Sequence, residues 1–267
     1  MRSIVCHGTC VNYLEQITEH RHVLYQLVRQ QITLRYRRTV LGYLWTLLNP
    51  LLMMSVTAVV FSAIFKMDLR TYAVFLFSGI IAFNLFSTIV VQSGQSLIGN
   101  EQLIKKIYIP KILFPLAVAL ALLIDSLLMF ASLFVIIVAI GGKITIPLIG
   151  LIPAYFVLFV FSLGIALVVS ISAVYFRDLQ HIMAIFMQAL IFLSPVYYKP
   201  ELLSGKVEWL INLNPLTHFI ELFRSPIYLG QFPSETSVYH CVMYAFASIT
   251  VGIWCFSRHE HRVAFRM

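Results

Sequence analysis

Three arginines stand within four residues of the chain, at Arg35, Arg37 and Arg38. A guanidinium group binds phosphate oxygens through paired hydrogen bonds, so a cluster of this kind suits a diphosphate group. Arginines that flank an apolar segment also anchor it to the anionic lipids of the cytoplasmic leaflet. The two roles are compatible, and the sequence supports both.

Ionisable residues that could carry catalysis or hold a metal are few. Asp125 is the only acidic residue deep in the first four apolar segments, and an isolated carboxylate there more often pairs with a cation than catalyses a reaction. The segment Cys6–Cys10 holds two cysteines and a histidine, but no second half at zinc-site spacing follows it. His181, His218 and His240 lie near segment ends and do not assemble into a Ser–His–Asp set. We therefore expect no catalytic residue and no metal in this chain.

A nucleotide-binding loop is not expected either. The pattern G-x-x-x-x-G-K-[ST] does not occur, and Gly141-Gly142-Lys143 has Ile137 where the first glycine belongs. We expect no cofactor in this chain; if ATP drives the protein, ATP and Mg²⁺ bind to a separate partner.

The composition is that of a membrane protein. Of 267 residues, 60% are hydrophobic and 11% are charged, whereas soluble domains have about 45–50% apolar and about 25% charged residues. One globular core cannot bury this excess, so the bilayer is the expected solvent. The net charge of +8 lies between apolar segments, where it sets orientation in the membrane rather than nucleic-acid binding. Met1–Cys10 lacks the apolar region of a signal peptide, so insertion is expected to use the internal segments.

Residues 11–38 are predicted to form an amphipathic helix. Polar residues occupy one side, and Arg21 interrupts the apolar stripe on the other. A helix of this pattern lies in the membrane interface or packs on a cytoplasmic partner, and the two are compatible. The apolar stripe consists of Tyr13, Leu14, Ile17, Leu24, Tyr25, Val28 and Ile32.

We expect an all-α fold in which six apolar helices cross the membrane. The predicted spans are 41–65, 72–91, 113–140, 147–176, 180–196 and 238–256. The fifth has an apolar centre of only ~12 residues, so it needs its polar flanks or a thin local bilayer. Residues 1–267 are expected to form a single domain.

Basic residues fix the predicted orientation, because they are in excess on the cytoplasmic side of a membrane. With the N-terminus inside, 13 of the 19 lysines and arginines fall in inner segments and 6 in outer ones. Both termini are therefore expected in the cytoplasm. The inner set is Arg2, Arg21, Arg29, Arg35, Arg37, Arg38, Lys105, Lys106, Lys111, Arg177, Arg258, Arg262 and Arg266.

Two connections between the predicted spans are polar and long enough to contain short helices. Residues 95–110 are polar and compatible with a helix that Pro110 ends. Residues 200–230 mix polar and aromatic residues with prolines, and they accommodate short helices at Glu201–Leu213 and Leu216–Leu229. Neither is long enough to cross a bilayer, but each can enter and leave one leaflet.

Aromatic residues have two interpretations. Near the expected interfaces they are typical of an aromatic belt, and within spans they are typical of contact with lipid. The alternative is a sugar pathway, because flat rings stack on the apolar C–H faces of sugars. The interfacial set is Tyr43, Trp45, Tyr197, Tyr198, Trp209 and Tyr228, and the set within spans is Phe61, Phe65, Phe83 and Phe86.

Five segments carry a family pattern. They are Arg35-Tyr36-Arg37-Arg38-Thr39-Val40-Leu41-Gly42-Tyr43-Leu44-Trp45 with Leu48-Asn49-Pro50-Leu51; Asn100 with Leu103-Ile104-Lys105-Lys106, Tyr108 and Pro110; Tyr175-Phe176-Arg177-Asp178; Ser194-Pro195-Val196-Tyr197-Tyr198; and Asn214-Pro215-Leu216-Thr217-His218-Phe219-Ile220-Glu221-Leu222-Phe223-Arg224. In this order they resemble the ABC-2 type permeases of the polysaccharide-export branch, which includes O-antigen, capsule and teichoic acid exporters. Single segments are weak signals, but the ordered set covers nearly the whole chain.

The resemblance implies a homodimer in a bacterial inner membrane that works with two copies of an ATPase subunit. Its channel would carry a polysaccharide on undecaprenyl pyrophosphate, with O-antigen as the leading candidate, and the arginine cluster would lie where the pyrophosphate enters. The expected glycan contacts are Tyr43, Trp45, Phe61, Phe65, Phe83, Phe86, Tyr197 and Tyr198. The expected ATPase contacts are Asn100, Glu101, Leu103, Lys105 and Lys106. The expected periplasmic gate includes Trp209, Asn214, Pro215, Glu221 and Arg224.

Other functions are kept as alternatives. Capsule and teichoic acid exporters share these motifs with O-antigen exporters. An ABC-2 exporter of drugs or small lipids shares the fold, and a narrower, less aromatic channel would favour it. A membrane-embedded glycosyl- or acyl-transferase would need a second functional ionisable residue at the depth of Asp125.

Overall fold

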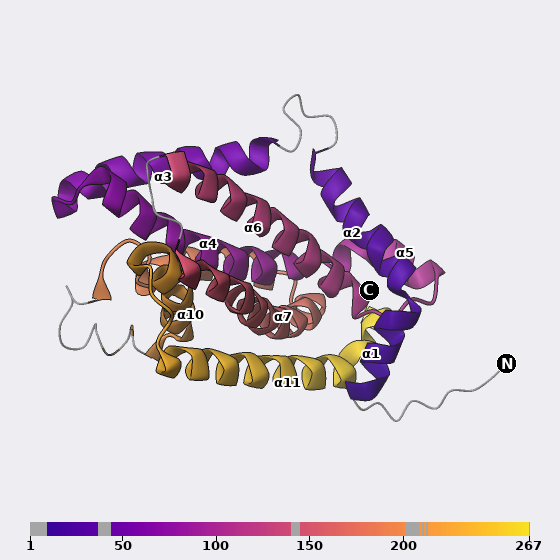
Figure 1. The fold of residues 1–267 in the computed structure, drawn as a ribbon. Coiled ribbons are helices and arrows are strands. Elements are labelled where there is room, and N and C mark those ends of the chain that lie inside the picture. The colour runs from indigo at the N-terminus through magenta and orange to yellow at the C-terminus, as the bar shows by residue number, and fades with distance from the viewer. Residues whose placement is uncertain are drawn as a thin grey trace.

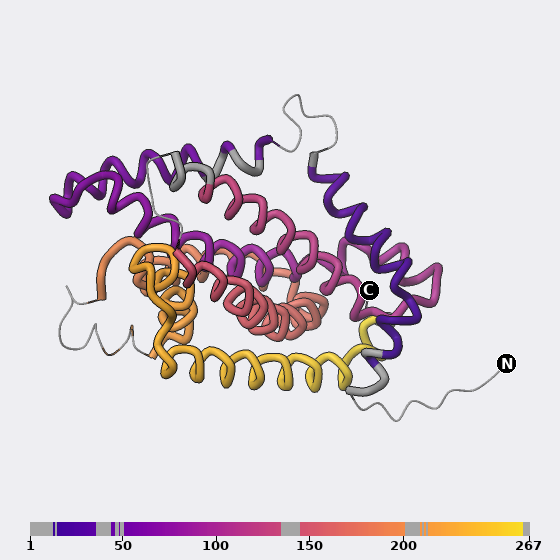
Figure 2. Tube along the Cα trace, in the orientation of Figure 1, coloured from indigo at the N-terminus to yellow at the C-terminus, as the bar shows by residue number. Residues whose placement is uncertain are grey.

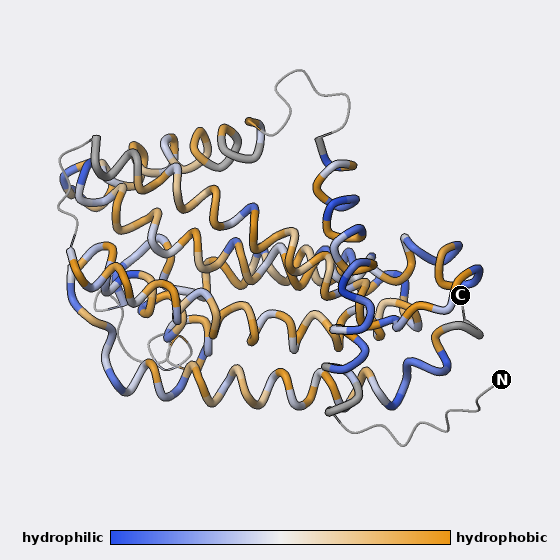
Figure 3. Tube along the Cα trace, turned by 45° about the vertical axis from the view of Figure 1, so that its right-hand side comes forward, coloured by the Kyte–Doolittle hydropathy of each residue, from blue (hydrophilic) through white to orange (hydrophobic). Residues whose placement is uncertain are grey.

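The computed structural model describes residues 10–36, 44–139, 145–200 and 213–266, together with Trp209 and Ile211. Within these residues every regular element is a helix, which confirms the prediction of an all-α protein for that part of the chain (Figure 1). The long helices lie side by side and are mostly apolar along their length (Figure 3).

Most of the predicted spans coincide with long helices. The long helices are α3 (Leu44–Phe65), α4 (Leu69–Ser93), α6 (Leu113–Ala139), α7 (Leu151–Tyr175) and α11 (Glu235–Arg266), and a short 3₁₀ turn, η2 (Ile146–Gly150), leads into α7. α8 (Leu179–Leu193) is shorter, with 15 residues.

Four segments are long and apolar enough to cross a membrane. They are Leu69–Ser93, Leu113–Phe134, Ile146–Tyr175 and Glu235–Val263. α8, with 15 residues, falls short of the roughly 20 residues that a straight crossing needs, whereas α3 has 22 residues, of which Leu51–Phe65 form an apolar stretch within the part of the chain described. Four of the six predicted spans therefore have the required length within the described residues, and the other two stay predictions.

Burial decreases from the centre of the bundle outward. In the most apolar window of α4, 72% of residues are buried, compared with 17% in that of α11. α4, α6, α7 and α10 (Pro215–Arg224) share one continuous apolar core. α11 contacts this core mainly through α7, so most of its surface is left for lipid.

α7 and α11 cross with their backbones in contact. A Cβ atom added to Gly252 would lie 2.4 Å from the carbonyl oxygen of Gly164, and one added to Gly164 would lie 2.4 Å from the carbonyl carbon of Ser248. The Ser248 hydroxyl donates a hydrogen bond to the carbonyl oxygen of Phe161 across the same crossing, at 2.7 Å. Small residues that bring two backbones together, with a hydroxyl bridging them, are typical of helix pairs in membranes.

The N-terminal helix is divided in two. α1 (Cys10–Glu19) and α2 (Arg21–Tyr36) are separated by a turn at His20, next to the arginine that interrupts the apolar stripe. Tyr13 in α1 and Leu27 in α2 are buried in an apolar cluster that also contains residues of α6, α7 and α11, whereas Tyr25 is 65% exposed. The prediction of a single helix was therefore wrong at His20, because α2 turns to pack along α6.

The two ends of the bundle differ in character. At one end lie α1, α2, the C-terminal part of α11, the turn η1 (Ile98–Asn100) and the six-residue helix α5 (Glu101–Lys106) (Figures 1 and 2). Lys111, just before α6, links this part of the chain to α11 by donating a hydrogen bond to the carbonyl oxygen of Glu260. We call it the α2–α5 end. The opposite end holds α10 and the π-helical turn η4 (Ser225–Leu229), and we call it the α10 end.

The close contact of α7 and α11 predicts that replacing Gly252 by alanine destabilises the protein, although alanine favours helices. Alanine is intrinsically better than glycine in a helix by ~1 kcal/mol, but at Gly252 the new methyl would meet backbone atoms that cannot move aside. We expect Gly252→Ala to lower the free energy of unfolding in detergent by about 1–3 kcal/mol. Gly99→Ala is the control, because a Cβ there meets no atom within 4 Å. Equal stability of the two variants would show that the helices do not touch at Gly252.

Candidate functional site

A cavity of about 560 Å³ lies between α4 and α8. Each helix contributes side chains that recur every three or four residues, so one face of each is turned toward the cavity. The α4 side is lined by Phe83, Ser87, Thr88, Val91 and Gln92, and the α8 side by Ala184, Met187, Gln188, Ile191 and Phe192, with Tyr197 following α8. We call this cavity the α4–α8 groove.

The groove combines polar groups with aromatic rings. Amides from Gln92 and Gln188 and hydroxyls from Ser87 and Thr88 lie within segments that are otherwise apolar. Such groups are costly in a bilayer unless they face a polar partner or a water-filled space, so their presence on one face is typical of a transport pathway. Amides and hydroxyls form hydrogen bonds with sugar hydroxyls, and rings cover the apolar faces of sugars.

Aromatic residues form a continuous stack where the groove approaches the α10 end. Phe61 stacks on Tyr197 with ring centres 5.5 Å apart, and Phe65 follows at 6.0 Å from Phe61. Phe192 packs on the other side of Tyr197, at 5.7 Å. The Tyr72 hydroxyl donates to the carbonyl oxygen of Tyr197 at 2.7 Å and so fixes the backbone that carries this ring.

The predicted glycan contacts separate into two groups. Phe83 and Tyr197 line the groove, and Phe61 and Phe65 continue the stack beside it. Phe86 is 4% exposed and stacks on Phe161 inside the core, with ring centres 5.5 Å apart, and its glycan contact stays a prediction.

Two of the remaining predicted contacts, Trp45 and Tyr198, are not among the residues that line the groove. Trp45 is about half exposed near the start of α3. The Tyr198 hydroxyl donates to the carbonyl oxygen of Phe192, at 2.9 Å. Tyr43 lies outside the described residues.

Arg35 lies at the end of α2 and reaches two other helices. Its guanidinium forms an ion pair with Asp125 in α6 and donates to the side-chain oxygen of Gln92 in α4, at 2.7 Å. This confirms the interpretation of Asp125 as a pairing residue. Arg37 and Arg38, the other predicted diphosphate ligands, lie outside the described residues.

The segment from η1 to α5 projects at the α2–α5 end (Figure 1). The Lys105 ammonium donates to the Glu101 carboxylate at 2.6 Å, and this bond and charge hold the pKa of Glu101 below its ordinary value. The Asn100 amide is tied back to the carbonyl oxygen of Ser96 at 2.8 Å. Within α5, Leu103 packs against the apolar cluster below the helix, and Lys106 is exposed.

Two apolar residues that follow α5 are exposed. Ile107 is 54% exposed and Tyr108 is 97% exposed. A tyrosine with nearly its whole surface in solvent, beside an exposed isoleucine and two lysines, forms a surface suited to a protein partner.

The predicted gate residues hold α10 in place. Asn214 caps α10, accepting from the backbone N–H of Leu216 and donating to the hydroxyl of Ser194, and Pro215 occupies the first turn, where its missing N–H costs nothing. Glu221 accepts hydrogen bonds from Ser234, which precedes α11, and from Ser237, which lies in its first turn.

Arg224 and Trp209 complete the predicted gate. Arg224 is 9% exposed; it donates to the carbonyl oxygens of Pro195 and Val196 and lies over the Phe75 ring at 3.8 Å. Trp209 is 65% exposed. The first predicted gate helix, Glu201–Leu213, lies outside the described residues except for three positions.

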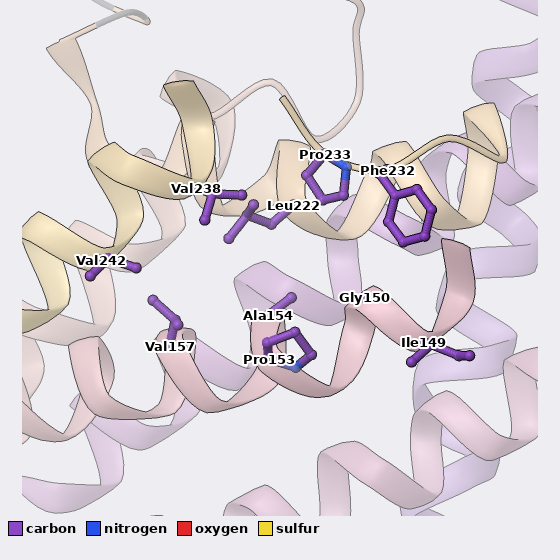
Figure 4. Close-up of a pocket in the computed structure, with 10 residues that line it drawn as sticks. All are labelled: Ile149, Gly150, Pro153, Ala154, Val157, Leu222, Phe232, Pro233, Val238 and Val242. Atoms are coloured by element: carbon purple, nitrogen blue, oxygen red, sulfur yellow. The ribbon is translucent and has the colours of Figure 1, made fainter. Parts of the chain in front are cut away.

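A second cavity at the α10 end is apolar. It measures about 380 Å³ and lies where η2 and α7 face α10, the segment before α11 and the start of α11 (Figure 4). Its walls carry aliphatic, proline and phenylalanine side chains, so it suits a hydrocarbon chain rather than a sugar. The lining residues are Ile149, Gly150, Pro153, Ala154, Val157, Leu222, Phe232, Pro233, Val238 and Val242.

The family model described as ABC-2 type transporter matches residues 22–228, which is most of the chain. The chain belongs to the ABC-2 type transporter family. The matched range contains Arg35, the α4–α8 groove, α5 and α10, whereas α1, the segment before α11 and α11 itself lie outside it.

Curated relatives in this family cover nearly the whole chain at low identity. An O-antigen export system permease protein RfbA from Klebsiella pneumoniae is 26% identical over 91% of this chain and 93% of its own length. The protein of the same name from Myxococcus xanthus is 25% identical over 84% of this chain and 86% of its own length. A polysialic acid transport protein KpsM from Escherichia coli is 24% identical over 88% of this chain and 92% of its own length.

The Arg35–Asp125 ion pair should contribute more to the stability of this ABC-2 chain than an exposed ion pair does. Its side chains are 28% and 13% exposed, so the pair lies between the surface and the interior. We expect Asp125→Ala to lower the free energy of unfolding in detergent by about 1–3 kcal/mol, because it leaves a partly buried guanidinium without its carboxylate. The control is Glu101→Ala, which removes the exposed pair to Lys105 and should cost less than about 1 kcal/mol. Equal losses in both variants would contradict a partly buried pair.

Proposed function

We propose that this chain is the membrane-spanning permease subunit of an ATP-driven exporter that moves a lipid-linked polysaccharide out of the cytoplasm. O-antigen on undecaprenyl pyrophosphate is the leading substrate. The observation that carries the proposal is the α4–α8 groove, whose amides, hydroxyls and rings match a glycan, in a member of the ABC-2 family. Relatives named as O-antigen export permeases support this choice of substrate.

The orientation follows from charge. Arg29, Arg35, Lys105, Lys106 and Arg177 all lie at the α2–α5 end, so we assign that end to the cytoplasm and both termini with it. The α10 end then faces the periplasm of a bacterial inner membrane. In this arrangement α3 and α8 would complete six crossings by using their polar flanks or a locally thinner bilayer. α10 would lie at the outer leaflet as part of a periplasmic gate.

A second copy of the chain closes the groove. The groove opens beside α8, and polar groups such as Gln188 would otherwise face lipid at a cost in free energy. Two copies that meet along α3 and α8 would turn two half-grooves into one channel. Exposed apolar side chains on these helices fit such a contact: Leu52, Met53, Val56, Val59, Val60 and Ile64 on α3, and Ile182, Ile185 and Phe186 on α8.

Energy would come from two copies of an ATPase subunit that bind ATP and Mg²⁺. α5 and the exposed Ile107 and Tyr108 form the surface on which that subunit would sit. α5 is joined through η1 to the end of α4, which forms one wall of the groove. Movement of α5 can therefore reach the groove through η1 and the short turn at residues 94–97. No chemistry on the substrate is assigned to this chain.

The diphosphate of the lipid carrier would meet Arg35 together with Arg37 and Arg38. Because Arg35 is engaged by Asp125, a diphosphate has to compete with this carboxylate for the guanidinium. Binding of the substrate would therefore be coupled to release of the contact between α2 and α6.

The alternative functions have less support than O-antigen export. Capsule export is supported by relatives named KpsM, which are slightly less similar than those named RfbA. Export of drugs or small lipids would be favoured by a narrower, less aromatic channel, whereas this groove is lined by Phe83, Phe192 and Tyr197. A transferase is disfavoured by the pairing of Asp125 with Arg35, which removes the carboxylate as a base.

Blocking the groove tests the transport pathway. Ala184 lines the groove, and Ala184→Trp is expected to reduce polysaccharide export at least tenfold while leaving membrane insertion and assembly intact, because the indole fills the space that the glycan needs. Val251→Trp places the same ring on the exposed side of α11 and should not affect export. Surface polysaccharide in a strain that lacks its own permease is the measurement. Normal export by the Ala184 variant would exclude the groove as the pathway.

Charge reversal on α5 tests the coupling surface. Lys105→Glu with Lys106→Glu is expected to abolish export and to remove stimulation of the ATPase by the permease, because the surface would repel its partner. Arg258→Glu reverses an exposed charge at the same end of the protein but outside α5, and it should retain coupling. Unchanged ATPase stimulation in the double variant would assign the partner to another surface.

A further inference from the structure

A smaller cavity of about 310 Å³ adjoins the groove at the α2–α5 end. It lies among α2, the end of α4, the η1 segment, α6 and the start of α8, and it shares Val91 and Gln92 with the groove. We call it the amide pocket. Its lining residues are Gln30, Gln31, Leu34, Val91, Gln92, Gln95, Ser96, Gly99, Asn100, Val118 and Gln180.

The lining is polar but carries no ionisable side chain. Five glutamines, one asparagine and one serine supply both hydrogen-bond donors and acceptors. This is unexpected at the α2–α5 end, where lysines and arginines are abundant outside the pocket. A pocket for phosphate would be expected to use those cations, so the lining is suited to a neutral ligand that both donates and accepts hydrogen bonds.

Several amides in the pocket are already oriented by one hydrogen bond. Gln92 accepts from Arg35 at 2.7 Å, which turns its amide nitrogen away from the guanidinium. The Gln95 nitrogen donates to the Gln180 oxygen at 2.6 Å, which leaves the Gln95 oxygen as an acceptor and the Gln180 nitrogen as a donor. An array of fixed donors and acceptors loses less side-chain entropy on binding than a set of mobile ones.

We propose that the amide pocket binds one neutral sugar ring. Its volume is at the lower end of the range for small-molecule sites, roughly 300–1,000 Å³, so it suits a single ring and not a chain. Hydroxyl and N-acetyl groups donate and accept hydrogen bonds as the amides do. Leu34, Val91 and Val118 provide the apolar contact for the C–H face of the ring.

The position of the pocket identifies which sugar it would hold. This step rests on the proposed function. Gln92 contacts Arg35, the predicted diphosphate ligand, and also lines both the pocket and the groove. A diphosphate at Arg35 would therefore place the sugar directly attached to it in the amide pocket, with the rest of the glycan directed into the groove. The pocket would then select substrates by the first sugar on the lipid carrier.

Binding to the full chain in nanodiscs tests the pocket. Three ligands are compared by competition: an isoprenyl diphosphate that carries one N-acetylhexosamine, the same lipid without a sugar, and the free methyl glycoside of that sugar. Gln30→Leu and Gln180→Leu change opposite walls of the pocket. Gln26→Leu is the matched control, because it makes the same change one helical turn earlier in α2, outside the pocket. Retained thermal stability of each variant establishes that it is folded.

We expect each pocket variant to bind the sugar-bearing lipid about fivefold more weakly, as for the loss of one neutral hydrogen bond. Binding of the sugar-free lipid should change less than twofold, and Gln26→Leu should bind both as the wild type does. If the free glycoside binds as tightly as the lipid-linked sugar and is equally sensitive to the variants, the pocket holds a sugar from the soluble pool.

Two results would overturn the proposal. Equal weakening for the sugar-bearing and the sugar-free lipid would show that the pocket recognises the diphosphate. Unchanged binding of the sugar-bearing lipid by both variants would show that the pocket is not a sugar site, as would capture of the ATPase subunit by a photo-crosslinker at Gln30. These outcomes are distinct from failure of the proposed function, in which the wild-type complex exports no lipid-linked glycan at all.

Discussion

The contact of Arg35 with Asp125 and Gln92 is the interaction on which the arrangement of the α2–α5 end depends. A guanidinium inside a helical bundle is costly unless its charge and its hydrogen bonds are met. Here they are met from two different helices, so α2 is held against both α6 and α4 at once. The same residue bonds Gln92, which lines both the amide pocket and the groove, so the position of α2 is tied to the lining of both cavities.

A second constraint is that polar side chains within the bilayer need a polar neighbour. It accounts for the position of Ser87, Thr88 and Gln92 of α4 on the side that faces Gln188 of α8. The same constraint supports the proposal that a second copy covers the groove, because Gln188 would otherwise lie beside lipid. The aromatic stack around Tyr197 and the capped helix α10 lie at one mouth of the groove, and the amide pocket lies at the other.

Hydrophobicity made the long helices predictable, because stretches such as Leu69–Ser93 can be read directly from composition and length. The pairing of Asp125 was also foreseeable, since a lone carboxylate in an apolar segment requires a cation. The break at His20 and the burial of Phe86 were not, because both depend on which neighbouring helix is contacted. Gln92 and Gln188 were missed, although isolated glutamines within apolar segments were a usable signal. Their meeting across α4 and α8 depends on packing between helices far apart in sequence.

The close crossing at Gly164 and Gly252 has a consequence for how the protein can change shape. Two helices whose backbones touch cannot slide past each other or rotate without collision, so α7 and α11 act as one rigid body. α8 has only limited contact with α4 and α7. Widening of the pathway must then fall on the thin wall formed by α8, while the α7–α11 pair serves as the fixed frame against which that wall moves.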